Sequence, residues 1–331
     1  MAVISPSWGG PHAFPKVYER GKQVLQDELG LEVVEMPHTR SPQYYLRWYP
    51  HARAADIDQA FMDPDIDGII ASIGGDDSVR ALPFLNTDAL MKNPKVLMGF
   101  SDTTTLLTHL SLRGMITFYG PSVMAGISQM GGRPRELQHL RDILFRPRPQ
   151  YDYRPSPSYS EGYPDWSDDA SIGKVNRRKR SPRWKALRGD GPVTGELFGG
   201  CIEVLEMMKG TRFWPPNSFW DGKVLFLETS ERVPTPSAVT LMLRNYGIMG
   251  AFDGMSALLL GRPRGYTAEQ RARFEKAVLS VVSEEFGRGD MPIVANMDFG
   301  HTDPQMVLPL GARVRVDPDG PGLRLLEPAV E

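Results

Sequence analysis

A serine, a glutamate and a histidine each stand at the end of a short apolar run in this sequence. Ser101 follows the run 96–100 and precedes a stretch with helical spacing of leucines, Glu228 ends VLFLE, and His301 follows the run 293–299 in FGHTDP. A serine activated by a histidine that a carboxylate orients is the nucleophilic arrangement of many hydrolases. The three residue types therefore indicate covalent hydrolytic chemistry if folding brings them together.

Each residue also has a structural interpretation. Ser101 or Asp102 could simply cap the helix that follows, and a carboxylate at a strand end such as Glu228 could face solvent. The order Ser, Glu, His is that of α/β-hydrolases, but their G-x-S-x-G elbow is incomplete because Thr103 replaces its last glycine. The sequence therefore argues against an ordinary α/β-hydrolase. His109 and His139 lie within helical patterns, which favours structural roles for both.

A glycine pair in IGGDDS (73–78) follows another apolar run. Adjacent glycines let backbone N–H groups approach a ligand closely, either as an oxyanion hole or as a phosphate cradle. As a phosphate cradle the loop would resemble the GGDGT loop of NAD and lipid kinases. A kinase would require Mg²⁺ and ATP, and it would leave Glu228 and His301 without roles. A third class, a ligand-binding protein without catalysis, would not need all three residue types.

The elements that must position these residues alternate in the first 145 residues. Apolar runs alternate with helical patterns, which predicts a parallel sheet covered by helices, with functional groups at the carboxyl ends of its strands. The predicted strands are 2–5, 31–36, 68–73 and 96–100, and the predicted helices are 15–29, 51–62 and 103–113.

The chain divides into three predicted parts: an N-terminal α/β domain (1–146), an interdomain loop (147–194) and a C-terminal domain (195–331). The middle part is rich in Pro, Ser and Tyr and then in Lys and Arg, which is typical of a linker or functional loop without regular structure. The last part predicts mixed α/β structure. Its elements are a turn leading into a helix at 195–210, strands at 223–228, 256–261 and 293–300, helices at 235–246 and 267–287, and a hairpin around the Asp-Gly of the tail.

Composition narrows the class of protein. A chain of 331 residues favours two domains, and a formal net charge of −2 argues against nucleic acid as a partner. The single cysteine, Cys201, excludes an intramolecular disulfide and a cysteine-based metal site. No apolar stretch reaches the length of a membrane span, and the N-terminus does not read as a signal peptide. We therefore expect a cytoplasmic protein without membrane partners.

Five ordered motifs carry a family resemblance: IIASIGGDDS, GFSDTTTL followed by FYGPSVM, GELFGGCIEVL, LFLETSE and DFGHTDP. Together they resemble the LD-carboxypeptidase family of serine peptidases, and within it the microcin C immunity branch. The resemblance implies a triad of Ser101, Glu228 and His301 and an oxyanion hole from backbone N–H groups of Gly75 and Asp102. It also implies a flavodoxin-like, doubly wound N-terminal domain, a C-terminal domain with a small barrel-like sheet, no cofactor, and a homodimer.

The same resemblance leaves two substrate classes open. One branch of the family removes a D-amino acid from L,D bonds of muropeptides. The other cleaves the bond between an aminoacyl or peptidyl group and a nucleotide-like moiety, and its members stack the nucleobase on a loop tryptophan. Here RSPRWKALRG supplies Trp184 for that role, with Asp76 of the GGDD loop as a second substrate contact, and base stacking contributes about 1–3 kcal/mol. These features favour the peptidyl-nucleotide class over the muropeptide class.

Overall fold

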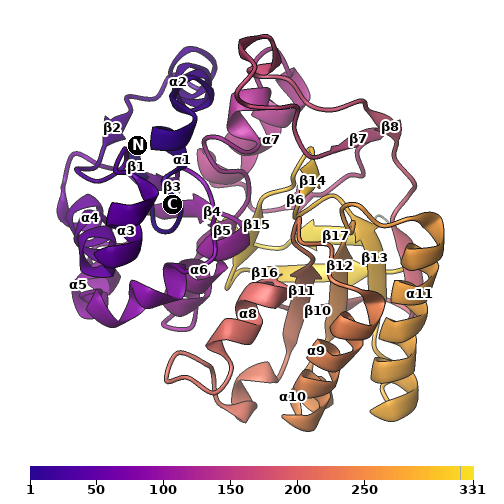
Figure 1. Cartoon of the computed structure of the whole chain (residues 1–331). Helices are drawn as coiled ribbons and strands as arrows, with labels where there is room; N and C mark the ends of the chain where they lie inside the picture. Colours follow the sequence, from indigo (N-terminus) through magenta and orange to yellow (C-terminus); the bar gives the residue numbers. More distant parts are fainter. Residues whose placement is uncertain (321) are drawn as a thin grey trace.

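A six-stranded sheet organises the N-terminal part of the computed structural model, which describes residues 1–320 and 322–331 (Figure 1). Strands β1 to β5 run parallel, and β15 pairs with β5 in the antiparallel direction. β1 and β3 are buried throughout, as expected for strands covered by helices on both faces. In sheet order the strands are β15 (Leu308–Leu310), β5 (Thr117–Tyr119), β4 (Val96–Gly99), β3 (Gly68–Ala71), β1 (Ala2–Ile4) and β2 (Val34–Glu35).

Helices surround this sheet where the sequence predicts them. The predicted helix 15–29 is α2 continued by the π-helical segment Val24–Glu28. The predicted strand 31–36 is shorter than expected, because β2 is an edge strand that pairs with β1 at two positions. The helices are α1 (Gly10–Ala13), α2 (Pro15–Gln23), α3 (Gln43–Trp48), α4 (Pro50–Met62), α5 (Thr87–Lys92), α6 (Thr104–Ser111) and α7 (Pro134–Leu144).

The strand order β2-β1-β3-β4-β5 is that of flavodoxin-like doubly wound sheets, so the predicted N-terminal fold class is confirmed. In such sheets ligands bind at the carboxyl edge, beside the point where the strand order reverses, here between β1 and β3. The segments that follow β1, β3 and β4 meet at this edge. They carry Ser7, the pair Gly74 and Gly75, and Ser101.

An eight-stranded mixed sheet forms the C-terminal part, for which the family resemblance implies a small barrel-like sheet and the sequence pattern predicts mixed α/β structure. Its four central strands, β10 to β13, run parallel, and antiparallel strands flank them. In sheet order the strands are β6 (Tyr151–Asp152), β17 (Gly322–Leu325), β16 (Arg313–Asp317), β10 (Val193–Cys201), β11 (Lys223–Glu228), β12 (Ala257–Gly261), β13 (Ile293–Met297) and β9 (Lys185–Arg188). The accompanying helices are α8 (Ile202–Met208), α9 (Pro236–Ile248), α10 (Ala251–Gly254) and α11 (Ala268–Leu279).

Two expectations from the sequence are wrong. The segment 147–194 is not structureless: β6 and β9 lie in the large sheet, and β7 (Ser158–Glu161) and β8 (Lys179–Arg180) form a small sheet with β14 (Thr302–Asp303). The start of 195–210 is not a turn but the end of β10. Its glycines serve close packing, since a Cβ on Gly200 would lie 2.4 Å from Cγ2 of Thr104.

β15 joins the two parts of the chain, because this C-terminal strand completes the N-terminal sheet. The residues that follow β11 and β13 consequently come to face the carboxyl edge of β4. No helix in the described part of the chain is long and apolar enough to cross a membrane.

Candidate active site

Ser101 occupies a strained turn between β4 and α6. Its φ of 57° lies in the left-handed region, which a non-glycine residue adopts at an energetic cost and which recurs at functional sites. A Cβ on Gly99 would lie 2.8 Å from Cγ2 of Thr103, so the elbow requires its first glycine although its last is replaced by a threonine. The turn therefore places the serine hydroxyl at the sheet edge despite the incomplete elbow motif.

The structure brings Ser101, His301 and Glu228 into one hydrogen-bonded chain. Nε2 of His301 lies 3.0 Å from Oγ of Ser101, and Nδ1 lies 2.7 Å from Oε2 of Glu228. All three side chains are buried, and a Cβ on Gly300 would lie 2.4 Å from Oε2 of Glu228. A serine placed in this way can lose its proton to the imidazole as it attacks a carbonyl carbon.

Tyr119 is a fourth member of this chain that the sequence analysis did not assign. Its hydroxyl donates to Oε1 of Glu228 at 2.6 Å and accepts the backbone N–H of Ser101 at 3.2 Å. Complete burial and the neighbouring charge of Glu228 raise the pKa of Tyr119, so the phenol keeps the proton that it donates. The residue lies in the FYG segment, where nothing in the local pattern marks a polar role.

Two carboxylates face His301 from opposite sides. Besides Glu228, Oε2 of Glu231 lies 3.0 Å from Nε2. Burial lowers the pKa of His301, but the two carboxylates outweigh it and raise the pKa to about 10. The hydrogen bond with His301 in turn lowers the pKa of Glu231 to about 2. Both carboxylates therefore favour the protonated form of His301.

The GGDD loop packs directly over the serine. A Cβ on Gly74 would lie 3.1 Å from Oγ of Ser101 and 3.4 Å from the backbone nitrogen of Asp102, and one on Gly75 would lie 2.1 Å from Oγ of Ser7. Asp102 belongs to the first turn of a helical segment, where backbone N–H groups have no partner within the helix. The geometry is compatible with the oxyanion hole predicted from Gly75 and Asp102, which stays a prediction.

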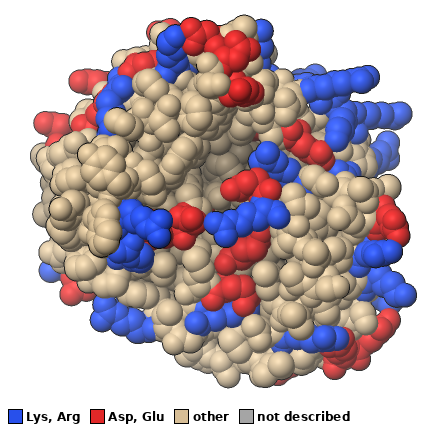
Figure 2. All heavy atoms as spheres, viewed as in Figure 1, with Lys and Arg blue, Asp and Glu red and all other residues tan. Residues whose placement is uncertain are grey.

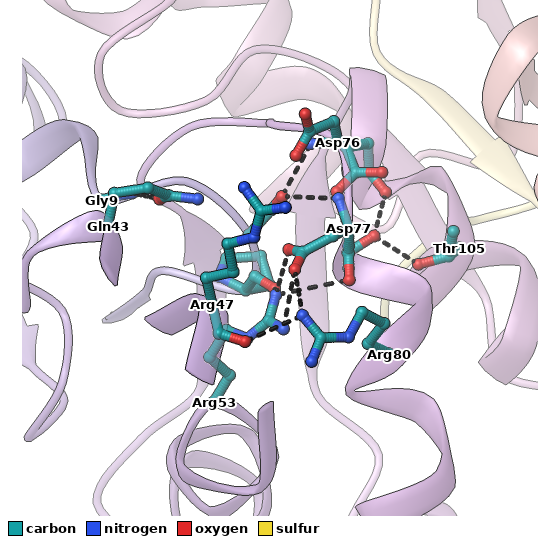
Figure 3. Close-up of polar contacts among 12 residues, drawn as sticks. Gly9, Gln43, Arg47, Arg53, Asp76, Asp77, Arg80 and Thr105 are labelled. Atoms are coloured by element: carbon teal, nitrogen blue, oxygen red, sulfur yellow. Dashed lines mark hydrogen bonds and ion pairs between the residues drawn. The ribbon is translucent and has the colours of Figure 1, made fainter. Parts of the chain in front are cut away.

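A polar network fixes this loop (Figure 3). The Ser7 hydroxyl accepts the backbone N–H groups of Asp76 and Asp77 at 3.0 and 3.3 Å. Figure 3 shows two arginines directed at Asp77, and one of them, Arg53, is fully buried and lies 2.7 Å from its carboxylate. Ser78 N–H donates to the buried Asp102 carboxylate at 2.7 Å, tying the loop to the residue after the nucleophile. The loop is thus preorganised rather than free to move.

A cavity of about 510 Å³ opens above Ser101 and His301, a size typical of small-molecule sites. Figure 2 shows a hollow on this face, with side chains of both charges along its rim. Asp76, predicted to contact the substrate, lines the cavity and lies 3.5 Å from Arg232 across its mouth. The lining also includes the aromatic residues Trp8, Phe100, Tyr163 and Trp166 and the charged residues Arg47, Glu231 and Arg264.

The structure does not bring Trp184 to this cavity, so its predicted substrate contact is not supported. Its indole Nε1 donates to Oδ2 of Asp298 at 2.8 Å, and its ring packs against Gly322. Trp166, from the same segment, lines the cavity instead and packs 5.5 Å from the Tyr163 ring. Choosing between the two tryptophans depends on how the segment folds, which the sequence pattern does not reveal.

Comparison with known proteins decides the family. The N-terminal domain of LD-carboxypeptidases matches residues 1–120, and their C-terminal domain matches residues 194–316. The chain belongs to the LD-carboxypeptidase family. This membership confirms the resemblance read from the motifs and leaves the kinase interpretation of the GGDD loop without support.

Several members resemble this chain over nearly its whole length. The microcin C7 self-immunity protein MccF of Escherichia coli is 30% identical over 93% of this chain and 87% of its own. An MccF-like protein from Streptococcus pneumoniae, solved in complex with AMP, is 30% identical, with a TM-score of 0.87 over 98% of this chain and 97% of that one. MccF in complex with aspartyl sulfamoyl adenosine also has a TM-score of 0.87, at 26% identity over 100% of this chain and 96% of that one.

Proposed function

We propose that the protein is a serine hydrolase that cleaves the amide bond joining an aminoacyl or peptidyl group to a nucleotide-like moiety. Ser101 is the nucleophile, His301 the general base and then the general acid, and Glu228 the residue that orients the imidazole. The observation that carries this proposal is the hydrogen-bonded chain Ser101–His301–Glu228 at the floor of the 510 Å³ cavity.

The reaction follows from this geometry. As Ser101 Oγ bonds to the carbonyl carbon, its proton passes to Nε2 of His301, and the developing oxyanion accepts hydrogen bonds from the backbone N–H groups of Gly75 and Asp102. His301 then gives the proton to the leaving nitrogen, the C–N bond breaks, and an acyl ester remains on Ser101. A water molecule, deprotonated by His301, cleaves the ester and restores the enzyme.

The lining of the cavity supports a nucleotide-like leaving group. Trp8, Tyr163 and Trp166 offer aromatic faces for a base, and Arg47, Arg232 and Arg264 offer charge to a phosphate or its sulfamoyl mimic. Two relatives with the same fold were solved with AMP and with aspartyl sulfamoyl adenosine. A muropeptide has no flat ring to use these faces.

Incubation with substrates tests the reaction type. We expect hydrolysis of an aspartyl sulfamoyl adenosine, followed by mass spectrometry, to proceed in EDTA and without ATP. An L,D-tetrapeptide should be cleaved slowly or not at all. Faster cleavage of the tetrapeptide would favour the muropeptide activity, and strict dependence on Mg²⁺ and ATP would contradict hydrolysis altogether.

Replacing Trp166 tests the nucleobase contact. Trp166→Ala should weaken binding of an aminoacyl sulfamoyl adenosine by about 1–3 kcal/mol, or roughly 5- to 150-fold, because a stacking face is lost. Isothermal titration with the Ser101→Ala background measures this. Trp184→Phe is the matched control: it removes the hydrogen bond to Asp298, so it should lower thermal stability without changing affinity. If Trp184→Phe weakened binding and Trp166→Ala did not, Trp184 would be the substrate contact, as the sequence predicted.

A further inference from the structure

Nε2 of His301 has two neighbours at the same distance. Oγ of Ser101 and Oε2 of Glu231 each lie 3.0 Å from it. A ring nitrogen carries either one proton or one lone pair, and a charged carboxylate accepts a proton more strongly than a hydroxyl does. Glu231 therefore stabilises the protonated ring, which is the form that cannot take a proton from Ser101.

The loop after β11 holds Glu231 in place through its backbone. The Glu203 carboxylate on α8 accepts Ser230 N–H at 3.1 Å and the Ser230 hydroxyl at 2.6 Å, and Val233 closes the turn with a φ of 52°. The Glu231 side chain, in contrast, is 51% exposed at the cavity. Its carboxylate can therefore change partner while the loop stays fixed.

Other charged side chains near His301 are less free than Glu231 to change their partners. Glu228, at the end of β11, is buried and bound to Tyr119, and Asp303 of β14 is buried as well. Arg264, from the segment after β12, lines the same cavity as Glu231, while Arg232 pairs with Asp76. Glu231 is thus the exposed carboxylate that reaches the atoms at which proton transfer takes place.

We propose that Glu231 binds the free α-ammonium group of an aminoacyl substrate, and that this change of partner frees Nε2 of His301 to accept the Ser101 proton. The inference rests on the proposed function, because it takes Ser101 as the nucleophile. In an aminoacyl group a single carbon separates the α-nitrogen from the carbonyl carbon that Ser101 attacks. Oγ of Ser101 and Oε2 of Glu231 both lie 3.0 Å from Nε2 of His301, so the Glu231 carboxylate is close to the place where this α-nitrogen would lie. When Glu231 turns to the ammonium, the proton on Nε2 passes to water in the open cavity.

This arrangement gives the enzyme a means of substrate selection. A substrate with a free α-amino group draws Glu231 away and releases the base. A substrate whose α-nitrogen is acylated, such as a peptidyl compound, is neutral there, so Glu231 stays beside His301 for more of the time and cleavage is slower. The same carboxylate therefore discriminates aminoacyl compounds from N-acylated peptides of similar size.

The pH dependence of Ser101 labelling tests the release of His301 without any assumption about substrate. We expect a fluorophosphonate to label wild-type Ser101 increasingly at alkaline pH. In Glu231→Gln the half-maximal pH should fall by about one unit or more, because one carboxylate no longer favours the imidazolium. Glu269→Gln, an exposed carboxylate on α11, should behave as wild type. Superimposable profiles for wild type and Glu231→Gln would overturn the inference, and absence of label on wild-type Ser101 would contradict the proposed function itself.

Steady-state kinetics tests the ammonium contact. Wild type should prefer an aminoacyl sulfamoyl adenosine over its N-acetyl form by about 10- to 100-fold in kcat/KM, since a charge-assisted hydrogen bond is lost with the acetyl group. Glu231→Gln should lose most of this preference, and Glu231→Asp should retain part of it. An equal preference in wild type and Glu231→Gln would show that the ammonium binds elsewhere.

Discussion

Ser101→Ala is expected to lower kcat for amide hydrolysis by about 10⁴-fold or more, because members of a catalytic triad act as a unit. The substitution removes one oxygen, whose partner is Nε2 of His301, and leaves the elbow backbone intact. Folding and substrate affinity should therefore change little. Rates measured by mass spectrometry, affinities by titration and Tm by scanning calorimetry separate the three effects.

Ser218→Ala is the matched control, because Ser218 is exposed and does not line the cavity above Ser101. It should keep wild-type activity, and a fluorophosphonate should label wild type and Ser218→Ala but not Ser101→Ala. Retention of more than a few per cent of activity in Ser101→Ala would contradict the assignment of the nucleophile. A label on another serine would do the same.

The sequence predicted the N-terminal sheet and the meeting of Ser101, Glu228 and His301 for one physical reason. Buried parallel strands are continuous apolar runs, and their carboxyl ends lie at one edge of a sheet, so the residues that end such runs are expected to meet. Ser101 after β4, Glu228 at the end of β11 and His301 after β13 follow this rule. Their contact also required β15 to join the two parts of the chain, which no local pattern indicates.

The residues that the sequence analysis missed depend on packing between distant segments. The fully buried Arg53 of a helix pairs with the partly exposed Asp77 of a loop. Tyr119 contacts the backbone of Ser101 because β5 lies beside β4. In the sequence, nothing distinguishes Glu231 from other loop carboxylates. Only the structure shows that it lies next to Nε2 of His301. Such roles arise from proximity in space, and a periodic pattern along the chain carries no information about them.

Glu228→Gln should reduce kcat by about 10⁴-fold, because the amide fixes the wrong tautomer of His301. The Tyr119 hydroxyl accepts the N–H of Ser101, so its own proton points to position 228. The amide oxygen of a glutamine must then face Tyr119, which turns its NH₂ group toward Nδ1. Nδ1 becomes an acceptor, Nε2 carries the proton, and the ring cannot take a proton from Ser101.

Tyr119→Phe in the Glu228→Gln background provides the decisive comparison. Without the tyrosine proton the amide can turn its oxygen toward Nδ1. The double variant should therefore recover activity by about tenfold or more, which corresponds to about 1.4 kcal/mol. The single variant Tyr119→Phe should lose some activity, because Glu228 then lacks one partner. Tyr119→Phe should therefore lower kcat in the wild type and raise it in Glu228→Gln. This opposite effect in the two backgrounds, measured as a double-mutant cycle, is specific to the tautomer mechanism. If Tyr119→Phe lowered the activity of Glu228→Gln further, the tyrosine would be a structural support rather than the group that orients residue 228.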